Sequence, residues 1–211
     1  MLSAQELQQV VPTLPRIAVH GLWTRALAFQ YTVRPPPGAP PGTSPDPLWP
    51  GGAQSRGARF TPKGSFESIY LASDPITALT EVSLVLQNPN IPAVTVATPP
   101  WVVFAVEGVV TEVVDLCDIA IQASLNTTLQ ELTGNWAYSQ SLYLNSQGSL
   151  PPTQMLGQAA YDCGVVTGLK YPSAKTPEST CLLVFPDRLI GSSSNYLEVY
   201  DPTQSLSGRL P

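Results

Sequence analysis

The chain has 211 residues, of which only 12% are charged, and its 10 basic and 15 acidic side chains give a formal net charge of −5. The basic residues are too few and too scattered to form the positive surface of a nucleic-acid-binding protein. The longest apolar run, residues 101–106, is far shorter than the roughly 20 residues that cross a bilayer. No charged start is followed by an apolar run and a cleavage site, so we expect a cytoplasmic protein that binds neither membrane nor nucleic acid.

The N-terminal part of the chain predicts a short helix, a strand and a long loop. Ser3 and Glu6 have the spacing of a capping box, and Pro12 ends the helix. Residues 17–29 are apolar and aromatic and predict a strand. Residues 34–52 contain eight prolines and four glycines in 19 positions, which predicts a partly polyproline-like loop. A disordered interdomain linker is the alternative, but the roughly 33 preceding residues are too few for a separate core.

A strand and a helix are predicted next. Residues 68–72 alternate between polar and apolar side chains, as in a half-buried strand. Asp74 suits a helix N-cap and Pro75 the first helical position, and we expect the helix to end just before Asn88. Four residues are predicted to share one face of this helix: Ile76, Leu79, Ser83 and Leu86. Glu81 lies about 150° from the centre of that face at 100° per residue.

The rest of the chain predicts an irregular mixture of strands and short helices. We expect, in order, one or two strands at 101–114 with a bend at Gly108, helices at 118–132 and 153–161, strands at 164–169, 180–185 and 196–200, and a loose tail at 201–211. Such a mixture is typical of an α+β fold rather than a doubly wound sheet. We therefore predict a single domain over residues 16–200 with a mixed β-sheet core, preceded by the helical extension 1–15.

The cysteine and histidine content limits the chemistry. Cys117, Cys163 and Cys181 are odd in number and sit among apolar neighbours, which is typical of small buried residues rather than disulfides. Without a CxxC pair and with His20 as the only histidine, no metal site is expected. A histidine-based catalytic triad would depend on His20, for which a structural role is the simpler interpretation.

Four polar residues stand at the ends of predicted elements and are candidates for a site: Arg59, Tyr70, Glu81 and Ser173. No G-x-S-x-G, P-loop or G-x-G-x-x-G pattern is present. Each candidate also has a structural interpretation. Arg59 could bridge a loop to an acidic residue, Glu81 could face solvent, Tyr70 could belong to the core, and Ser173 could stabilise a turn.

Several motifs in the chain resemble those of the RES-domain family, the toxin components of Xre-RES toxin–antitoxin pairs. In chain order they are GLWTR at 21–25, GARFTPKG at 57–64, IYLA at 69–72, TALTEV at 77–82 and GLKYPSA at 168–174. The resemblance extends over residues 16–189. The Arg, Glu and Ser of the family name correspond to Arg25, Glu81 and Ser173. The family often has Trp where this chain has Phe60.

The resemblance implies an ADP-ribosyltransferase-like fold with a cleft for NAD+. Members of the family destroy NAD+ by phosphorolysis or hydrolysis, or transfer ADP-ribose to a protein. It therefore implies a toxin enzyme that cleaves NAD+ at the nicotinamide–ribose bond and halts growth, with NAD+ as substrate, inorganic phosphate as an optional co-substrate and no metal. An Xre-type helix-turn-helix antitoxin is the implied partner, and homo-oligomerisation is left open. A protein ADP-ribosyltransferase and a non-catalytic binding module on the same fold are the alternatives.

The resemblance also implies roles for individual residues. Glu81 would orient the ribose and stabilise positive charge, with Arg25 and Ser173 completing the catalytic set. Arg25 and Arg59 would hold the pyrophosphate, because a guanidinium matches phosphate oxygens. Tyr70 would border the nicotinamide ring, and Ser173 would hydrogen-bond the ribose or a phosphate. Two further residues are candidates for the pocket walls, with the hydrophobic core as the favoured interpretation of both: Trp23 and Phe60.

Overall fold

The computed structural model describes residues 1–83, 85–88, 91–95, 100–190 and 194–211. Its strands are β1 (Ile17–Ala28), β2 (Ile69–Ala72), β3 (Val85–Asn88), β4 (Ile91–Thr95), β5 (Trp101–Asp115), β6 (Gly168–Pro172), β7 (Thr180–Val184), β8 (Tyr196–Tyr200) and β9 (Arg209–Leu210). Its helices are α1 (Ala4–Val10), α2 (Gln30–Val33), α3 (Gly51–Arg56), α4 (Pro75–Glu81), α5 (Ile119–Ser124), α6 (Leu129–Thr133), α7 (Trp136–Leu144) and α8 (Pro152–Asp162), with 3₁₀ turns η1 (Val11–Thr13) and η2 (Pro186–Arg188).

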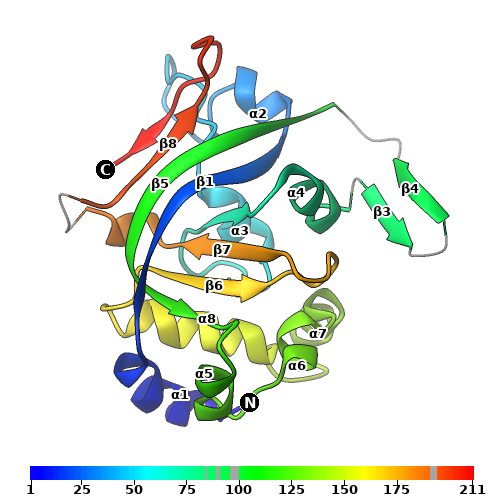
Figure 1. The fold of residues 1–211 in the computed structure, drawn as a ribbon, viewed down its shortest axis with the longest axis vertical. Helices are drawn as coiled ribbons and strands as arrows, with labels where there is room; N and C mark the ends of the chain where they lie inside the picture. The colour runs from blue at the N-terminus through cyan, green and yellow to red at the C-terminus, as the bar shows by residue number, and fades with distance from the viewer. Residues whose placement is uncertain (84, 89–90, 96–99, 191–193) are drawn as a thin grey trace.

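A seven-stranded mixed sheet, in the order β1-β2-β7-β6-β5-β8-β9, organises the molecule (Figure 1). β1 meets β2 at the pair Thr24–Ala72 and pairs with β5 from Ile17 to Ala28. β6 joins β5 in parallel, whereas the other pairings are antiparallel. Because β5 also pairs with β1, the strands β1, β2, β7, β6 and β5 form a closed ring of pairings. The mixed sheet with several short helices confirms the predicted α+β class.

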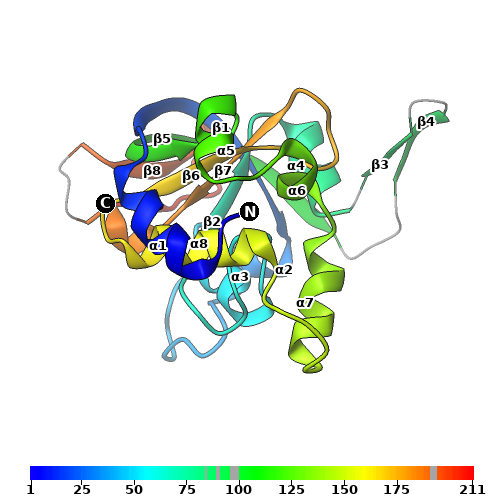
Figure 2. The same cartoon turned by 90° about the horizontal axis from the view of Figure 1, so that it is seen from below.

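The central strand β7 is buried on both of its faces. Successive side chains of a strand point to opposite faces, so Cys181 and Leu183 enter one core cluster and Leu182 and Val184 enter the other. The first cluster lies under α1, α5, α6 and α8, which Figure 2 shows together on one side of the sheet. The second lies between β1, β2, β5, β7 and β8. This two-sided burial explains the continuous apolar run that predicted the strand.

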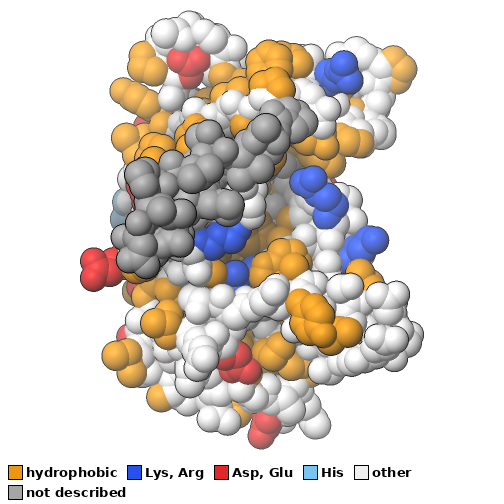
Figure 3. All heavy atoms as spheres, turned by 90° about the vertical axis from the view of Figure 1, so that its right-hand side faces the viewer, with side chains coloured by type: hydrophobic (Ala, Val, Ile, Leu, Met, Phe, Trp, Pro, Cys, Tyr) orange, Lys and Arg blue, Asp and Glu red, His pale blue; other side chains and the backbone are white. Residues whose placement is uncertain are grey.

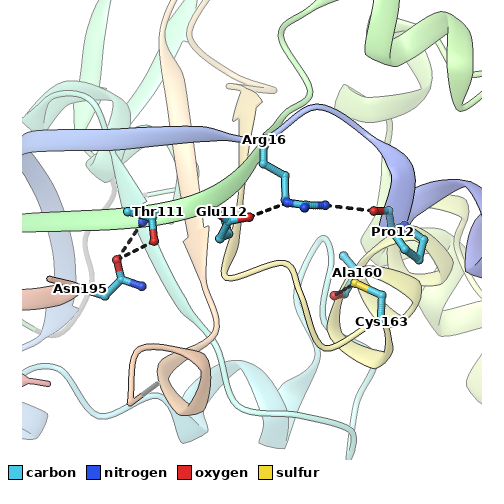
Figure 4. Close-up of polar contacts among 7 residues, drawn as sticks. All are labelled: Pro12, Arg16, Thr111, Glu112, Ala160, Cys163 and Asn195. Atoms are coloured by element: carbon cyan, nitrogen blue, oxygen red, sulfur yellow. Dashed lines mark hydrogen bonds and ion pairs between the residues drawn. The ribbon is translucent and has the colours of Figure 1, made fainter. Parts of the chain in front are cut away.

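A bulge in β5 is fixed from both sides (Figure 4). The register shifts between the pairs Ile17–Val113 and Val19–Val110, and Glu112 adopts a left-handed φ of 58°. Arg16 joins Glu112 at 2.6 Å and also donates to the Pro12 carbonyl, while the Asn195 side chain accepts two hydrogen bonds from Thr111. The bulge thereby connects η1 and the residue before β8 to the longest strand.

The helix predicted to run from Asp74 to just before Asn88 is shorter than expected. The Asp74 cap and Pro75 start are confirmed, but α4 ends at Glu81, Ser83 takes a left-handed φ of 63°, and residues 85–88 form β3. The predicted apolar face is also wrong. The buried residues of α4 are Thr77, Ala78 and Thr80, whereas Ile76 is 48% exposed. Glu81 therefore belongs to the inward side of this helix; the side chain of Leu86 lies outside the described residues.

Other boundaries also differ from expectation. The helix predicted at 118–132 is divided into α5 and α6, the strand predicted at 164–169 begins at Gly168, and the tail 201–211 contains β9. The elements α2, α3, β4 and α7 were not predicted. Between α5 and α6, Asn126 has a φ of 47°, which a helix cannot contain. The proline-rich segment is a loop up to Pro50, and Leu48 within it is fully buried. None of the helices in the described ranges is long and apolar enough to cross a membrane.

Candidate functional site

A cleft of about 350 Å³ lies where β1, β2, α3 and α4 meet. The described residues that line it include three arginines and one carboxylate: Arg25, Arg56, Arg59 and Glu81. They also include six aromatic residues: Tyr31, Trp49, Tyr70, Trp101, Trp136 and Tyr171. The cleft is thus positively charged in a chain whose net charge is −5. Figure 3 shows Lys and Arg side chains around a hollow with hydrophobic side chains inside it.

The carboxylate of Glu81 is anchored through one of its two oxygens. Oε1 accepts hydrogen bonds from the Ser173 hydroxyl at 2.6 Å and from the Ala174 backbone N–H at 2.9 Å. Lys175 donates to the backbone carbonyl of Glu81 and to the Ser83 hydroxyl, which fixes the end of α4. Oε2 accepts no hydrogen bond from any residue in the described ranges. One carboxylate oxygen is therefore held in place, and the other is available to a ligand.

Ser173 supports Glu81 from behind the cleft. Its side chain is 9% exposed, and it is not part of the cleft lining. The hydroxyl oxygen accepts from the backbone N–H groups of Lys175 and Thr176, so its single proton is directed at Glu81. Ser173 thus acts on the orientation of the carboxylate.

Arg25 carries a buried donor that no described residue satisfies. Its Nη2 donates to the Trp49 carbonyl at 2.9 Å, but its Nη1 has no hydrogen-bond partner among the described residues. Burial lowers the pKa of the Arg25 guanidinium to about 10, against the opposing effect of the Asp46 carboxylate. The side chain therefore remains a cation near neutral pH. An unpaired buried N–H is costly, and an anion in the cleft would satisfy it.

Arg59 is fixed by the end of α6. It is 7% exposed, and its Nη1 donates to the carbonyls of Leu132 and Gly134, each at 2.9 Å. These contacts hold the guanidinium in one orientation at the cleft wall. Arg56, which the sequence did not single out, is exposed at the same wall, and its guanidinium forms no hydrogen bond or ion pair within the described part of the chain.

The turn that carries Arg56 and Arg59 is held by two glutamines. The Gln154 amide donates to the Ala58 and Thr61 carbonyls and to the Gln140 side chain, which in turn donates to the Arg56 carbonyl. Gly57 has a φ of 82°, and a Cβ there would overlap the Gln140 side chain. A glycine is therefore required at this turn.

Tyr70 and Cys181 contribute to the cleft wall but carry no charge near neutral pH. The Tyr70 hydroxyl accepts from the Phe60 backbone N–H and hydrogen-bonds Thr61, and burial raises its pKa to about 12. The Tyr70 ring meets the Tyr171 ring edge to face. Burial also raises the pKa of the Cys181 thiol, so Cys181 is not a thiolate nucleophile.

The structure brings four of the seven predicted site residues to the cleft surface: Arg25, Arg59, Tyr70 and Glu81. Ser173 contacts Glu81 from behind. Trp23 and Phe60 are 8% and 0% exposed and lie in the two core clusters, which is the interpretation that the sequence favoured for both.

Sequence reasoning missed most of the aromatic lining. Three of the four tryptophans, Trp49, Trp101 and Trp136, border the cleft and are partly exposed, and Tyr31 lies beside Trp49. The low number of tryptophans was the one signal available. Trp49 lies in a loop, Trp101 begins a strand and Trp136 begins a helix, so no local sequence pattern connects them.

Two of three comparisons with known proteins find a match. The model of the RES domain matches residues 31–204. Among solved structures, the fold is similar to a chain in the crystal structure of the M. tuberculosis MbcT–MbcA toxin–antitoxin complex, with a TM-score of 0.59 and 16% sequence identity over 93% of this chain and 90% of that chain. No curated protein matches the sequence.

Proposed function

The chain belongs to the RES domain family, and from this premise we propose that its cleft binds NAD+ and breaks the bond between nicotinamide and ribose. The observation that carries the proposal is the pairing of one anchored carboxylate, Glu81, with three arginines in an aromatic-lined cleft. A dinucleotide combines two flat bases with a diphosphate, so it requires both aromatic surfaces and cations.

The arginines suit the diphosphate. Among the described residues, Arg25 has an unpaired buried N–H and Arg56 has no internal partner, and Arg59 is oriented by two carbonyls. A guanidinium presents a fork of N–H donors that matches phosphate oxygens. Binding would give the Arg25 donor its missing partner without breaking an existing contact.

Glu81 suits the reacting ribose. As the C1′–N1 bond breaks, its electron pair passes to the nicotinamide nitrogen, and the ribose becomes an oxocarbenium-like cation. A carboxylate stabilises that developing charge, and Oε2 of Glu81, which accepts no hydrogen bond from the described residues, is the oxygen that can face it. Water or inorganic phosphate then forms the new bond at C1′; water gives up a proton in doing so. Nicotinamide leaves as a neutral molecule, so no acid is needed to protonate it.

A toxin role under the control of an antitoxin is part of the same proposal. Loss of cellular NAD+ would stop growth, and the structural neighbour is part of a toxin–antitoxin complex. We expect an Xre-type helix-turn-helix protein as the partner of this chain and the cytoplasm as its location.

The products of labelled NAD+ test the proposal and identify the acceptor. Purified protein would be incubated with NAD+ with and without inorganic phosphate. We expect free nicotinamide in both cases, accompanied by ADP-ribose for hydrolysis or by ADP-ribose-1″-phosphate for phosphorolysis. Labelled protein would instead identify an ADP-ribosyltransferase, and intact NAD+ under all conditions would identify a non-catalytic binding module.

Ser173→Ala is expected to lower kcat about tenfold with little change in KM. The change removes one of the two hydrogen bonds that orient Oε1 of Glu81, while the arginines and the cleft lining stay as they are. One hydrogen bond to a charged group is worth about 1.5–3 kcal/mol, and the Ala174 N–H remains. Steady-state kinetics with NAD+ measures the effect, with Ser141→Ala on exposed α7 as the control. An equal rise in KM would mean that Ser173 contacts the substrate instead.

A further inference from the structure

The proline-rich segment ends in an aromatic corner to which the proposed reaction assigns no part of the substrate. Tyr31 in α2 precedes the segment, and Trp49 is near its end. Their rings lie 6.2 Å apart at 36°, and both side chains line the cleft and are partly exposed. The two ends of the segment therefore lie close together, and the side chains of Tyr31 and Trp49 form one wall of the cleft.

The Trp49 end of the segment is anchored firmly. Leu48 is fully buried in the core, and its backbone N–H donates to the Asp46 carboxylate at 2.8 Å. The Trp49 ring packs over Gly51, where a Cβ would overlap it. Proline restricts the backbone before folding, so the segment presents Trp49 as a preorganised surface.

The aromatic corner lies on the opposite side of Arg25 from Glu81. Glu81 ends α4 and is held by Ser173, directly after β6, and β7 and β2 separate β6 from β1 in the sheet. From Arg25, β1 runs about 10 Å at 3.3 Å per residue to Ala28, two residues before α2. Arg25 connects the two regions, because its Nη2 donates to the Trp49 carbonyl. The order along the cleft is thus carboxylate, cation, aromatic corner.

This order matches the order of groups in a dinucleotide, and we propose that Tyr31 and Trp49 form the subsite for the adenine ring of the substrate. The inference rests on the proposed function, because the scissile bond at Glu81 and the diphosphate at Arg25 determine where the far base must lie. Arg56 lies at the same corner, where Gly52 is next to both the Trp49 ring and the Arg56 guanidinium, and adds positive charge there.

Trp49→Ala tests the subsite with two substrates that share the scissile bond. Nicotinamide mononucleotide lacks the AMP half of NAD+. Stacking of a base on an aromatic ring contributes substantially to binding, so we expect kcat/KM for NAD+ to fall about tenfold to a hundredfold and kcat/KM for the mononucleotide to stay within about twofold. Trp49→Phe should retain most activity on NAD+. Tyr138→Ala, which removes an exposed aromatic side chain outside the cleft, is the matched control.

Calorimetry with AMP gives a readout that does not depend on cleavage. We expect AMP to bind the wild-type protein and to lose at least tenfold in affinity in Trp49→Ala, while thermal unfolding shows that the variant is folded. Equal losses of kcat/KM on both substrates, or an unchanged affinity for AMP, would overturn the subsite. Wild-type protein that cleaves neither substrate but binds AMP through Trp49 would refute the proposed reaction and support the subsite; failure of wild-type protein to bind AMP would refute the subsite.

Discussion

Glu81→Gln is expected to reduce kcat for NAD+ cleavage by about 10²–10³-fold, the usual effect of removing an electrostatic group that stabilises a transition state. Glutamine keeps an oxygen acceptor for the Ser173 hydroxyl and the Ala174 N–H, so the side chain should keep its position. It loses the negative charge that would face the cationic ribose. Single-turnover release of nicotinamide measures the chemical step directly.

The same variant should fold normally and still bind the substrate. The melting temperature should remain near that of the wild-type protein, because the hydrogen bonds of the side chain are preserved, and the affinity for ADP-ribose should change little. Glu67→Gln alters an exposed carboxylate that does not line the cleft and is the matched control. Wild-type turnover by Glu81→Gln would remove Glu81 from the mechanism.

Arg59→Ala is expected to affect both stability and binding. Removal of the guanidinium leaves the Leu132 and Gly134 carbonyls without their donor. The loss of charge-assisted hydrogen bonds should cost about 2–3 kcal/mol, which corresponds to a fall in melting temperature of about 5–10 °C for a chain of this length. Affinity for ADP-ribose should fall about tenfold, because one phosphate contact is lost.

Two measurements separate the structural and binding roles of Arg59. Thermal unfolding reports the first, and calorimetry with ADP-ribose, well below the melting temperature, reports the second. Arg34→Ala changes an exposed arginine that does not line the cleft and should alter neither. A lower melting temperature with unchanged affinity would mean that Arg59 stabilises the end of α6 and does not bind the substrate.

Elements with local signals were predictable from the sequence. The capping box of α1 and the Asp74–Pro75 start of α4 are both present, since each depends on residues at most three positions apart. The end of α4 was not predictable, because Lys175, 94 residues away, holds the carbonyl of Glu81. The true inward face of α4 is formed by small and polar residues such as Thr77 and Thr80, which a search for an apolar stripe overlooks.

The sequence predicted most of the ionic residues of the candidate site, with Arg56 missed, but only Tyr70 among its aromatic residues. In a chain with so few charges, the motifs around Arg25, Arg59 and Glu81 stand out, and the structure brings these residues to one cleft. No local sequence pattern connects Trp49 with Trp136. Both residues line the same cleft only because of the closed ring of strands and the packing of α7. The placement of Ser173 behind Glu81 likewise depends on contacts across the fold.

The most direct test of the central claim is the release of nicotinamide from NAD+ by the purified, folded protein. The proposed mechanism predicts multiple turnovers by the wild-type protein and a loss of about 10²–10³-fold in rate in Glu81→Gln. NAD+ that stays intact with the wild-type protein, with and without inorganic phosphate, would contradict it.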